Sequence, residues 1–158
     1  MGRSLMADDP MVVAQAVRAR LCELDGPVMA LLGLVVESVT PEKATVSMVV
    51  RPDMVNSHQY CHGGLVFTLA DHAFAYACCA QNRTGVTLAS HILYLQAAKL
   101  GDGLTAVAQL LNLDEDTGWG TVEVINQDEV VVARYRGTWF RLAAKIVPEL
   151  DSPAPTLD

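Results

Sequence analysis

The sequence predicts an α+β domain in which an antiparallel sheet curls around one long central helix. Residues 64–80 contain no proline and no internal glycine, and they are apolar on nearly every side. A helix of that kind is normally enclosed by a sheet or by another subunit. Two strand-like runs precede this segment and four come after it. We therefore expect a single domain over residues 1–147, with the helix as its core.

The elements before the central helix have their own signals. Pro10 favours a helix start, and apolar residues spaced along one face predict an extra N-terminal helix over about 10–24, which Gly26-Pro27 ends. Two Val/Leu-rich runs, at 31–39 and 43–51, then predict a hairpin.

After the central helix, turn residues separate four predicted strands, at 86–97, 103–113, 119–126 and 129–141. We expect residues 1–8 to be disordered, as well as a proline-rich tail over 148–158. The predicted elements leave the outer face of the sheet uncovered, so we also expect dimers or larger assemblies.

Composition excludes some classes of function. The formal net charge is −7 and the isoelectric point is near 4.9, which argues against nucleic acid as the main partner. Asp71 and His72 interrupt the longest apolar stretch, so we expect no membrane span. The N-terminus has no secretory core. These observations predict a cytoplasmic protein.

A single phosphorylated ligand needs only a few local cations. The candidates are Lys99, Arg134, Arg136 and Arg141, although each is also an ordinary surface cation.

The most informative stretch runs from Asn56 to Gly64 and is followed by Asp71 inside the apolar run. The helix start at Gly63-Gly64 presents free backbone N–H groups, which can hold an oxygen that becomes negative. A carboxylate in the same site can act as a base or nucleophile. These parts suit acyl transfer or thioester hydrolysis.

Asp71 shares a narrow helix stripe with Thr68 and His72. Burying an unpaired carboxylate is costly, and neither neighbour is a convincing partner, so we favour a catalytic role over a surface position. For His62 we weigh support of the oxyanion, general base catalysis and a purely structural role.

His58, Cys61 and His62 form a cluster that only weakly resembles a zinc site, and we expect no metal. Adjacent residues in an extended segment point opposite ways, so Cys61 is expected to pack rather than act as a nucleophile with His62.

Together these residues resemble a known family. An Asn, five intervening residues, His-Gly-Gly and an Asp in the following helix are the pattern of hotdog-fold thioesterases of the phenylacetic-acid-degradation (PaaI-like) type. The chain has Asn56, His62-Gly63-Gly64 and Asp71 in that order, and the segment from Tyr94 to Ala106 is also similar. The resemblance covers roughly residues 30–142.

The resemblance implies hydrolysis of acyl-coenzyme A, with coenzyme A as part of the substrate and no cofactor. It implies a homodimer as the minimal active unit, commonly paired into a homotetramer. By similarity, Gly63 and Gly64 polarise the thioester carbonyl with His62 beside them, and Asn56 places water. Asp71 of the partner chain is the base or nucleophile, and Thr87 assists it.

Two departures from the family pattern stand out. Gln59 occupies a position that is often glycine, which predicts a different path for the loop before His62. Ala97 replaces a frequent proline.

Two alternatives remain: a non-catalytic acyl-CoA-binding or regulatory protein on the same fold, and a hotdog enoyl-CoA hydratase. The family suggests aryl-acyl substrates of the phenylacetyl type, but the sequence does not choose between these and medium-chain fatty acyl groups.

Overall fold

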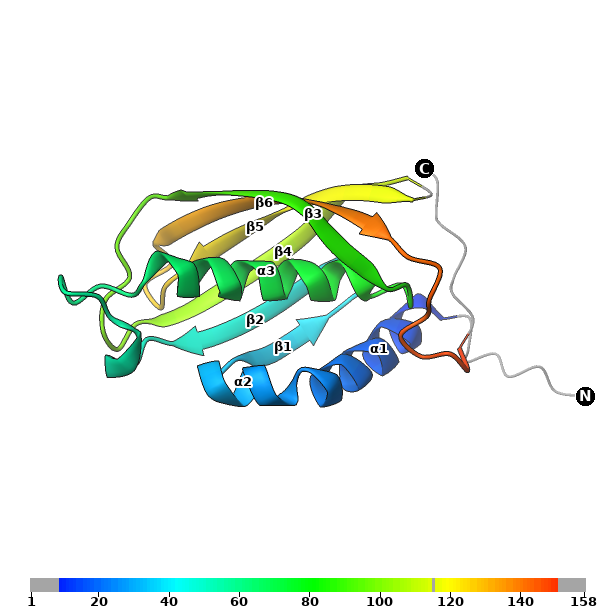
Figure 1. Ribbon diagram of the computed structural model, residues 1–158, viewed down its shortest axis with the longest axis horizontal. Helices are drawn as coiled ribbons and strands as arrows, with labels where there is room; N and C mark the ends of the chain where they lie inside the picture. Colours follow the sequence, from blue (N-terminus) through cyan, green and yellow to red (C-terminus); the bar gives the residue numbers. More distant parts are fainter. Residues whose placement is uncertain (1–8, 115, 151–158) are drawn as a thin grey trace, which may run out of the picture.

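The computed structural model describes residues 9–114 and 116–150 (Figure 1). Its six strands form one antiparallel sheet in the order β1-β2-β4-β5-β6-β3. The elements in chain order are α1 (Pro10–Leu24), α2 (Gly26–Leu32), β1 (Val35–Val39), β2 (Lys43–Val49), the 3₁₀ turn η1 (Pro52–Met54), α3 (Gly63–Cys79), β3 (Gly85–Tyr94), β4 (Gly103–Leu113), β5 (Thr117–Ile125) and β6 (Val131–Arg141).

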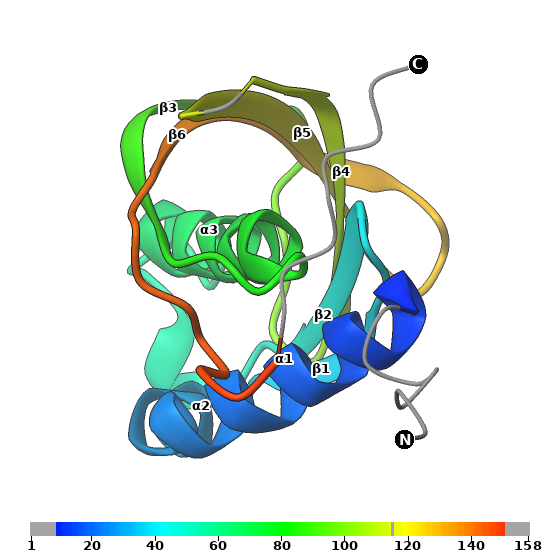
Figure 2. The same ribbon diagram turned by 90° about the vertical axis from the view of Figure 1, so that its right-hand side faces the viewer.

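The long helix α3 lies inside the curved sheet, as the sequence predicts. Figure 2 shows the strands bending around it, with α1 and α2 below. Nine of its seventeen residues are buried, and they point in several directions around the helix axis. Thr68, Asp71 and His72 are only partly buried, so the predicted polar stripe is the flank that the core covers least.

The N-terminal region contains the predicted helix, but the segment after that helix differs from the prediction. The Asp9 carboxylate caps α1 by accepting a hydrogen bond from the Met11 N–H at 2.8 Å. Gly26 and Pro27 do not end the helical region but begin α2, since proline is tolerated in a first turn. Gly33, at φ 67°, ends α2, and the first strand therefore begins only at Val35 rather than at residue 31.

The other strands lie where the sequence predicts them, with ends that differ by up to three residues. The C-terminal segment continues past the expected boundary at residue 148. Buried Asn82 donates from its amide to the carbonyls of Val147 and Leu150, both at 2.9 Å. The expectations for residues 1–8 and 151–158 lie outside the described part of the chain.

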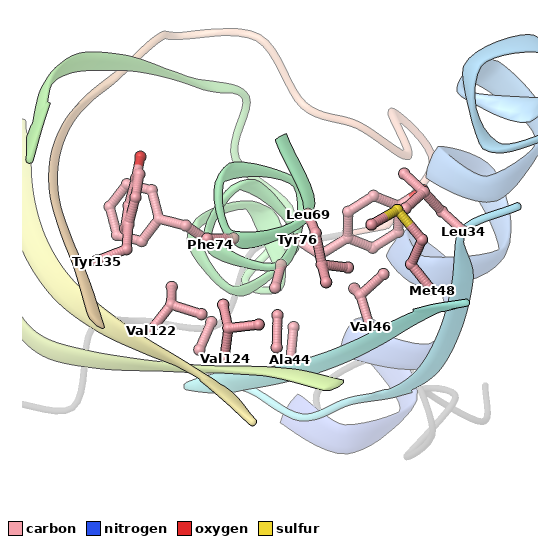
Figure 3. Close-up of a cluster of buried hydrophobic side chains, with 14 of the residues drawn as sticks. Leu34, Ala44, Val46, Met48, Leu69, Phe74, Tyr76, Val122, Val124 and Tyr135 are labelled. Atoms are coloured by element: carbon pink, nitrogen blue, oxygen red, sulfur yellow. The ribbon is translucent and has the colours of Figure 1, made fainter. Parts of the chain in front are cut away.

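Contact between α3 and the sheet is close enough to require a glycine. Phe74 of α3 packs beside Tyr135 of β6 in the core cluster of Figure 3. A Cβ atom at Gly137, also on β6, would lie 2.5 Å from the Phe74 ring. Phe74 is fully buried, so it has little room to move away.

Gly137→Ala should therefore destabilise the protein by about 1–3 kcal/mol, the usual cost of overpacking a core. Chemical denaturation measures the change. Gly103→Ala is the matched control, because a Cβ there meets nothing within 4 Å. Equal free energies of unfolding for the two variants would show that the helix does not press on β6.

Among the described residues, no helix is both long and apolar enough to cross a membrane.

Candidate active site

The loop ahead of α3 is organised by Asn56. Its side-chain Oδ1 accepts hydrogen bonds from the backbone N–H groups of His58, at 2.9 Å, and Tyr60, at 3.2 Å. Its own N–H donates to the Tyr60 carbonyl at 2.8 Å. The oxygen of the side chain therefore shapes the loop, which leaves the amide NH₂ group to contact water or substrate.

Gln59 takes up the conformation that the sequence associates with glycine. Its φ is 63°, in the left-handed region, and its N–H donates to the Asn56 carbonyl at 2.9 Å. This conformation costs a residue with a Cβ atom roughly 1–2 kcal/mol. The loop thus has the left-handed backbone that a glycine would allow at this position, although a glutamine stands there, and it pays for this conformation in strain.

The start of α3 is fixed from both sides. The N–H of Cys61 donates to the Ala98 carbonyl at 2.8 Å, and the N–H of His62 donates to the Met54 carbonyl at 2.9 Å. As expected, the two side chains point apart: Cys61 is buried and His62 is exposed. Burial raises the pKa of the Cys61 thiol, which opposes a thiolate nucleophile.

His62 is the N-cap residue of α3, but its side chain makes no capping hydrogen bond. Its carbonyl accepts from the N–H groups of Leu65 and Val66. The first-turn N–H groups of Gly63 and Gly64 have no partner within the helix, so they remain available to an oxygen. Across the chain, the Tyr94 hydroxyl donates to the Gly63 carbonyl at 2.8 Å.

Asp71 lies on the polar flank of α3 and is held by two hydroxyl groups. Its Oδ1 accepts from the Tyr135 hydroxyl at 2.6 Å and from the Thr87 hydroxyl at 3.3 Å. Thr87 is the helper residue suggested by the family resemblance, and the structure brings it to the carboxylate. Tyr135 was not expected. The partners of this half-buried carboxylate are thus two neutral donors, one from β6 and one from β3.

The other two residues of the stripe have different partners. The Thr68 hydroxyl donates back to the Gly64 carbonyl at 2.9 Å, within the helix. The His72 ring stacks on Tyr76, with 4.8 Å between ring centroids, and its buried Nε2 has no hydrogen-bond partner in the described chain. Burial lowers the pKa of His72, against the opposing charges of Asp25 and Asp71.

Asp71 and the helix start are far apart within one chain. Asp71 follows Gly64 by seven positions, which is about 10 Å along the axis of an α-helix. A carbonyl oxygen held at the Gly64 N–H places its carbon only about 4 Å away, given ordinary hydrogen-bond and bond lengths. The thioester carbonyl alone therefore does not span the distance between the two backbone positions of one chain.

The candidate phosphate-binding cations are not equivalent. Arg134 pairs with Glu123 at 2.8 Å, and Arg136 lies 4.4 Å from the Trp119 ring centroid. Arg141 is buried against Trp139, and burial lowers its pKa, so it is less accessible to a phosphate than the other three. Lys99 is exposed and its backbone bridges to Tyr60, beside the loop that leads to α3.

The His58, Cys61 and His62 cluster does not converge. Over residues 9–114 and 116–150, no group of three or more His, Cys, Asp or Glu side chains is placed to hold a metal ion.

Comparison with known proteins places this geometry in a family. The model of the thioesterase superfamily matches residues 58–133. Acyl-coenzyme A thioesterase PaaI of Escherichia coli is 42% identical over 118 residues, which are 75% of this chain and 84% of PaaI.

Two solved structures are similar to this chain. The structure of the E. coli PaaI protein from the phenylacetic acid degradation operon superposes with a TM-score of 0.82 at 38% identity, covering 84% of this chain and 96% of PaaI. A hypothetical thioesterase protein of Streptococcus pneumoniae, solved with coenzyme A, gives a TM-score of 0.69 at 28% identity, covering 71% of this chain and 88% of that chain.

The chain belongs to the thioesterase superfamily: it is a thioester hydrolase with the hotdog fold. Within that superfamily its similarity is to the PaaI type, which confirms the resemblance seen in the sequence motif.

Sequence reasoning missed Tyr135, the strongest partner of Asp71. The available signal was its alternation in the final strand, where Ala133, Tyr135 and Trp139 are buried and Arg134 and Arg136 are not. That pattern indicates that Tyr135 faces the core, but only the fold shows which helix residue accepts a hydrogen bond from its hydroxyl.

The two functions of the Asn56 side chain can be separated. Asn56→Asp keeps the oxygen that accepts from His58 and Tyr60 but removes the NH₂ group, while Asn56→Ala removes both. If the NH₂ group places water, Asp should lower kcat by about 10-fold or more while keeping the melting temperature. Ala should also destabilise the protein by roughly 1 kcal/mol.

Steady-state kinetics and thermal unfolding of both variants check this. Full activity in Asn56→Asp would mean that Asn56 only holds the loop.

Proposed function

We propose that the protein hydrolyses acyl-CoA thioesters of the aryl-acyl, phenylacetyl type to the free acid and CoA. The observation that carries the proposal is the Asp71 carboxylate, which accepts hydrogen bonds from two hydroxyl groups. It lies on a thioesterase fold whose central helix begins with N–H groups that have no partner within the helix. Support for the substrate comes from two relatives. One is named an acyl-CoA thioesterase and belongs to a phenylacetic acid degradation operon, and the other was solved with coenzyme A.

The proposed roles follow from charge development. Attack on the thioester carbonyl makes its oxygen negative, and the N–H groups of Gly63 and Gly64 stabilise that charge, with His62 beside them. Asp71 either takes a proton from water, whose oxygen forms the new C–O bond, or forms that bond itself. In both routes the C–S bond breaks and the CoA thiolate leaves, to be protonated to the thiol. A carboxyl anhydride formed by the second route is then hydrolysed by water.

The site is composite in this proposal. The backbones of Gly64 and Asp71 lie about 10 Å apart along one helix, which supports a site that takes its helix start from one chain and Asp71 from a second. The edge strand β3 offers the place for that second chain. Among the described strands it pairs with β6 alone, and it exposes Val86, Leu88, Leu93 and Tyr94 by 45–60%. A homodimer is then the minimal active unit.

Further assembly and location complete the proposal. Val35, Val49, Val107, Leu111 and Phe140 are exposed apolar residues on β1, β2, β4 and β6. Such a surface suits the pairing of two dimers into a homotetramer. We place the enzyme in the cytoplasm, with no cofactor beyond the CoA of its substrate and with no nucleic acid or membrane partner.

Replacement of the carboxylate is the central test. Asp71→Asn keeps the shape of the side chain and its acceptor oxygen, but it removes the base. Turnover of aryl-acyl-CoA should fall by about 10³-fold or more, while substrate still binds. Loss of substrate, followed chromatographically over a panel of acyl-CoAs, measures this without thiol dyes, which four cysteines would confuse.

Asp128→Asn, in an exposed turn, is the control and should behave as wild type. Wild-type turnover by Asp71→Asn would contradict the proposed role of Asp71 as base or nucleophile. A single turnover in ¹⁸O-water can identify direct attack: if water opens the anhydride at the Asp71 carbonyl, the first product carries an Asp71 oxygen and the label stays on Asp71, whereas the general-base route always labels the product. Binding without hydrolysis across the panel would favour the regulatory alternative, and hydration of an enoyl-CoA would favour the hydratase.

Mixing two inactive chains tests whether the site is shared. Gly63→Pro removes one first-turn N–H, and His62, at φ −56° and ψ 131°, already has the extended backbone that precedes proline. A dimer of one such chain and one Asp71→Asn chain has one intact site of two. Random exchange in an equal mixture makes about half of the dimers mixed, so the mixture should recover about a quarter of wild-type activity.

Each variant alone must remain inactive and folded, as activity and circular dichroism will show. A mixture as inactive as its parents, despite proven exchange of chains, would place the whole site in one chain.

A further inference from the structure

We propose that Tyr135 is the positioning residue of the Asp71 carboxylate, holding Oδ1 so that Oδ2 is the oxygen that meets water or substrate. This inference rests on the proposed function of Asp71. It assigns a role to a buried core tyrosine on β6 that lies 64 residues from Asp71 in the chain.

The hydrogen bond itself is short. The distance from the Tyr135 hydroxyl to Oδ1 of Asp71 is 2.6 Å, within the range of an O–H donor bound to an ionised oxygen. Thr87 donates to the same oxygen, but at 3.3 Å and from an exposed position on the edge strand. Tyr135 is therefore the principal donor and Thr87 the secondary one.

The two donors leave the carboxylate asymmetric. Both hydrogen bonds fall on Oδ1, and the described residues provide none to Oδ2. The terminal torsion of an aspartate has broad preferences, so its two oxygens exchange places easily unless one is anchored. Anchoring Oδ1 fixes the plane of the carboxylate and presents Oδ2 in one direction.

Tyr135 is well suited to hold a neighbour still. Its residue is 1% exposed, and its ring packs against Phe67 and Phe74, with ring centroids 5.5 and 5.6 Å away. Its strand pairs with β5 on one side and β3 on the other. In Figure 3 the hydroxyl oxygen lies at the rim of the cluster, away from Val122.

The hydroxyl also stays a donor at neutral pH. Burial and, after it, the hydrogen bond to Asp71 raise the pKa of Tyr135 well above its usual range, against a smaller opposing effect of a Ser90 hydrogen bond. The phenol is therefore neutral, so it orients the carboxylate without cancelling its charge.

Packing alone does not explain the hydroxyl. A phenylalanine would fill the same space between Phe67 and Phe74, and a buried hydroxyl costs free energy unless it is hydrogen-bonded. The core offers a comparison in Tyr76, also 1% exposed, which lies on the other side of α3 in Figure 3. Its hydroxyl contacts the sulfur atoms of Cys22, at 3.8 Å, and Met29, at 3.7 Å, and a hydrogen bond with Asp25 adds to the rise of its pKa, so this hydroxyl has partners other than Asp71.

Tyr135→Phe tests the proposal, with Tyr76→Phe as the matched control. Loss of a hydrogen bond to a charged group corresponds to roughly a 10- to 100-fold change in rate when it acts in the transition state. We expect Tyr135→Phe to lower kcat by about that factor with KM changed less than about 2-fold. Tyr76→Phe should keep kcat. Similar melting temperatures for the two variants would show that the difference is not one of folding.

A double variant confirms that Tyr135 acts through Asp71. In the Asp71→Asn background, Tyr135→Phe should lower the residual rate no further, because the group that it positions is already gone. Additive losses would show that Tyr135 acts elsewhere, and a kcat for Tyr135→Phe equal to that of Tyr76→Phe would overturn the proposal. Either result is distinct from failure of the proposed function, in which Asp71→Asn itself stays active.

Discussion

Enclosure of α3 by the sheet is the constraint on which the rest of the molecule depends. The helix is apolar in nearly every direction, so it is stable only where strands surround it. The close approach at Gly137 fixes how deeply it sits, and its rotation about its axis is fixed by what it buries. Once that rotation is set, Thr68, Asp71 and His72 share the one flank left partly open. The position of the carboxylate is thus a consequence of core packing.

The kind of partner on that flank matters as much as its position. An arginine or lysine beside Asp71 would neutralise the carboxylate and form a strong ion pair. Two hydroxyls instead orient it and leave its negative charge in place. A carboxylate that must accept a proton or form a bond needs this combination of order and available charge. Neutral donors in a half-buried site provide it at little electrostatic cost.

The sequence predicts the features that depend on local pattern and misses those that depend on contacts between distant elements. The extent of α3 and the positions of most strands are predicted by periodicity and turn residues, and the Asn56-to-Asp71 motif indicates the proposed site. Gly26-Pro27 misleads, because the same pair that ends α1 also suits the first turn of α2. Tyr135 and Asp71 meet only because β6 curls over α3, which no local pattern encodes. Gln59 shows the reverse, a conformation set by its loop although its residue type disfavours it.

The edge strand β3 connects the two ends of the proposed catalytic arrangement. Thr87, near its start, donates to Asp71, while Tyr94, at its end, donates to the Gly63 carbonyl. That carbonyl belongs to the same peptide group as the Gly64 N–H, so the strand orients one of the donors proposed to bind the thioester oxygen. In the proposed dimer, the strand that meets the second chain is also bonded to both functional parts of α3. Assembly and alignment of the proposed site would then depend on the same strand.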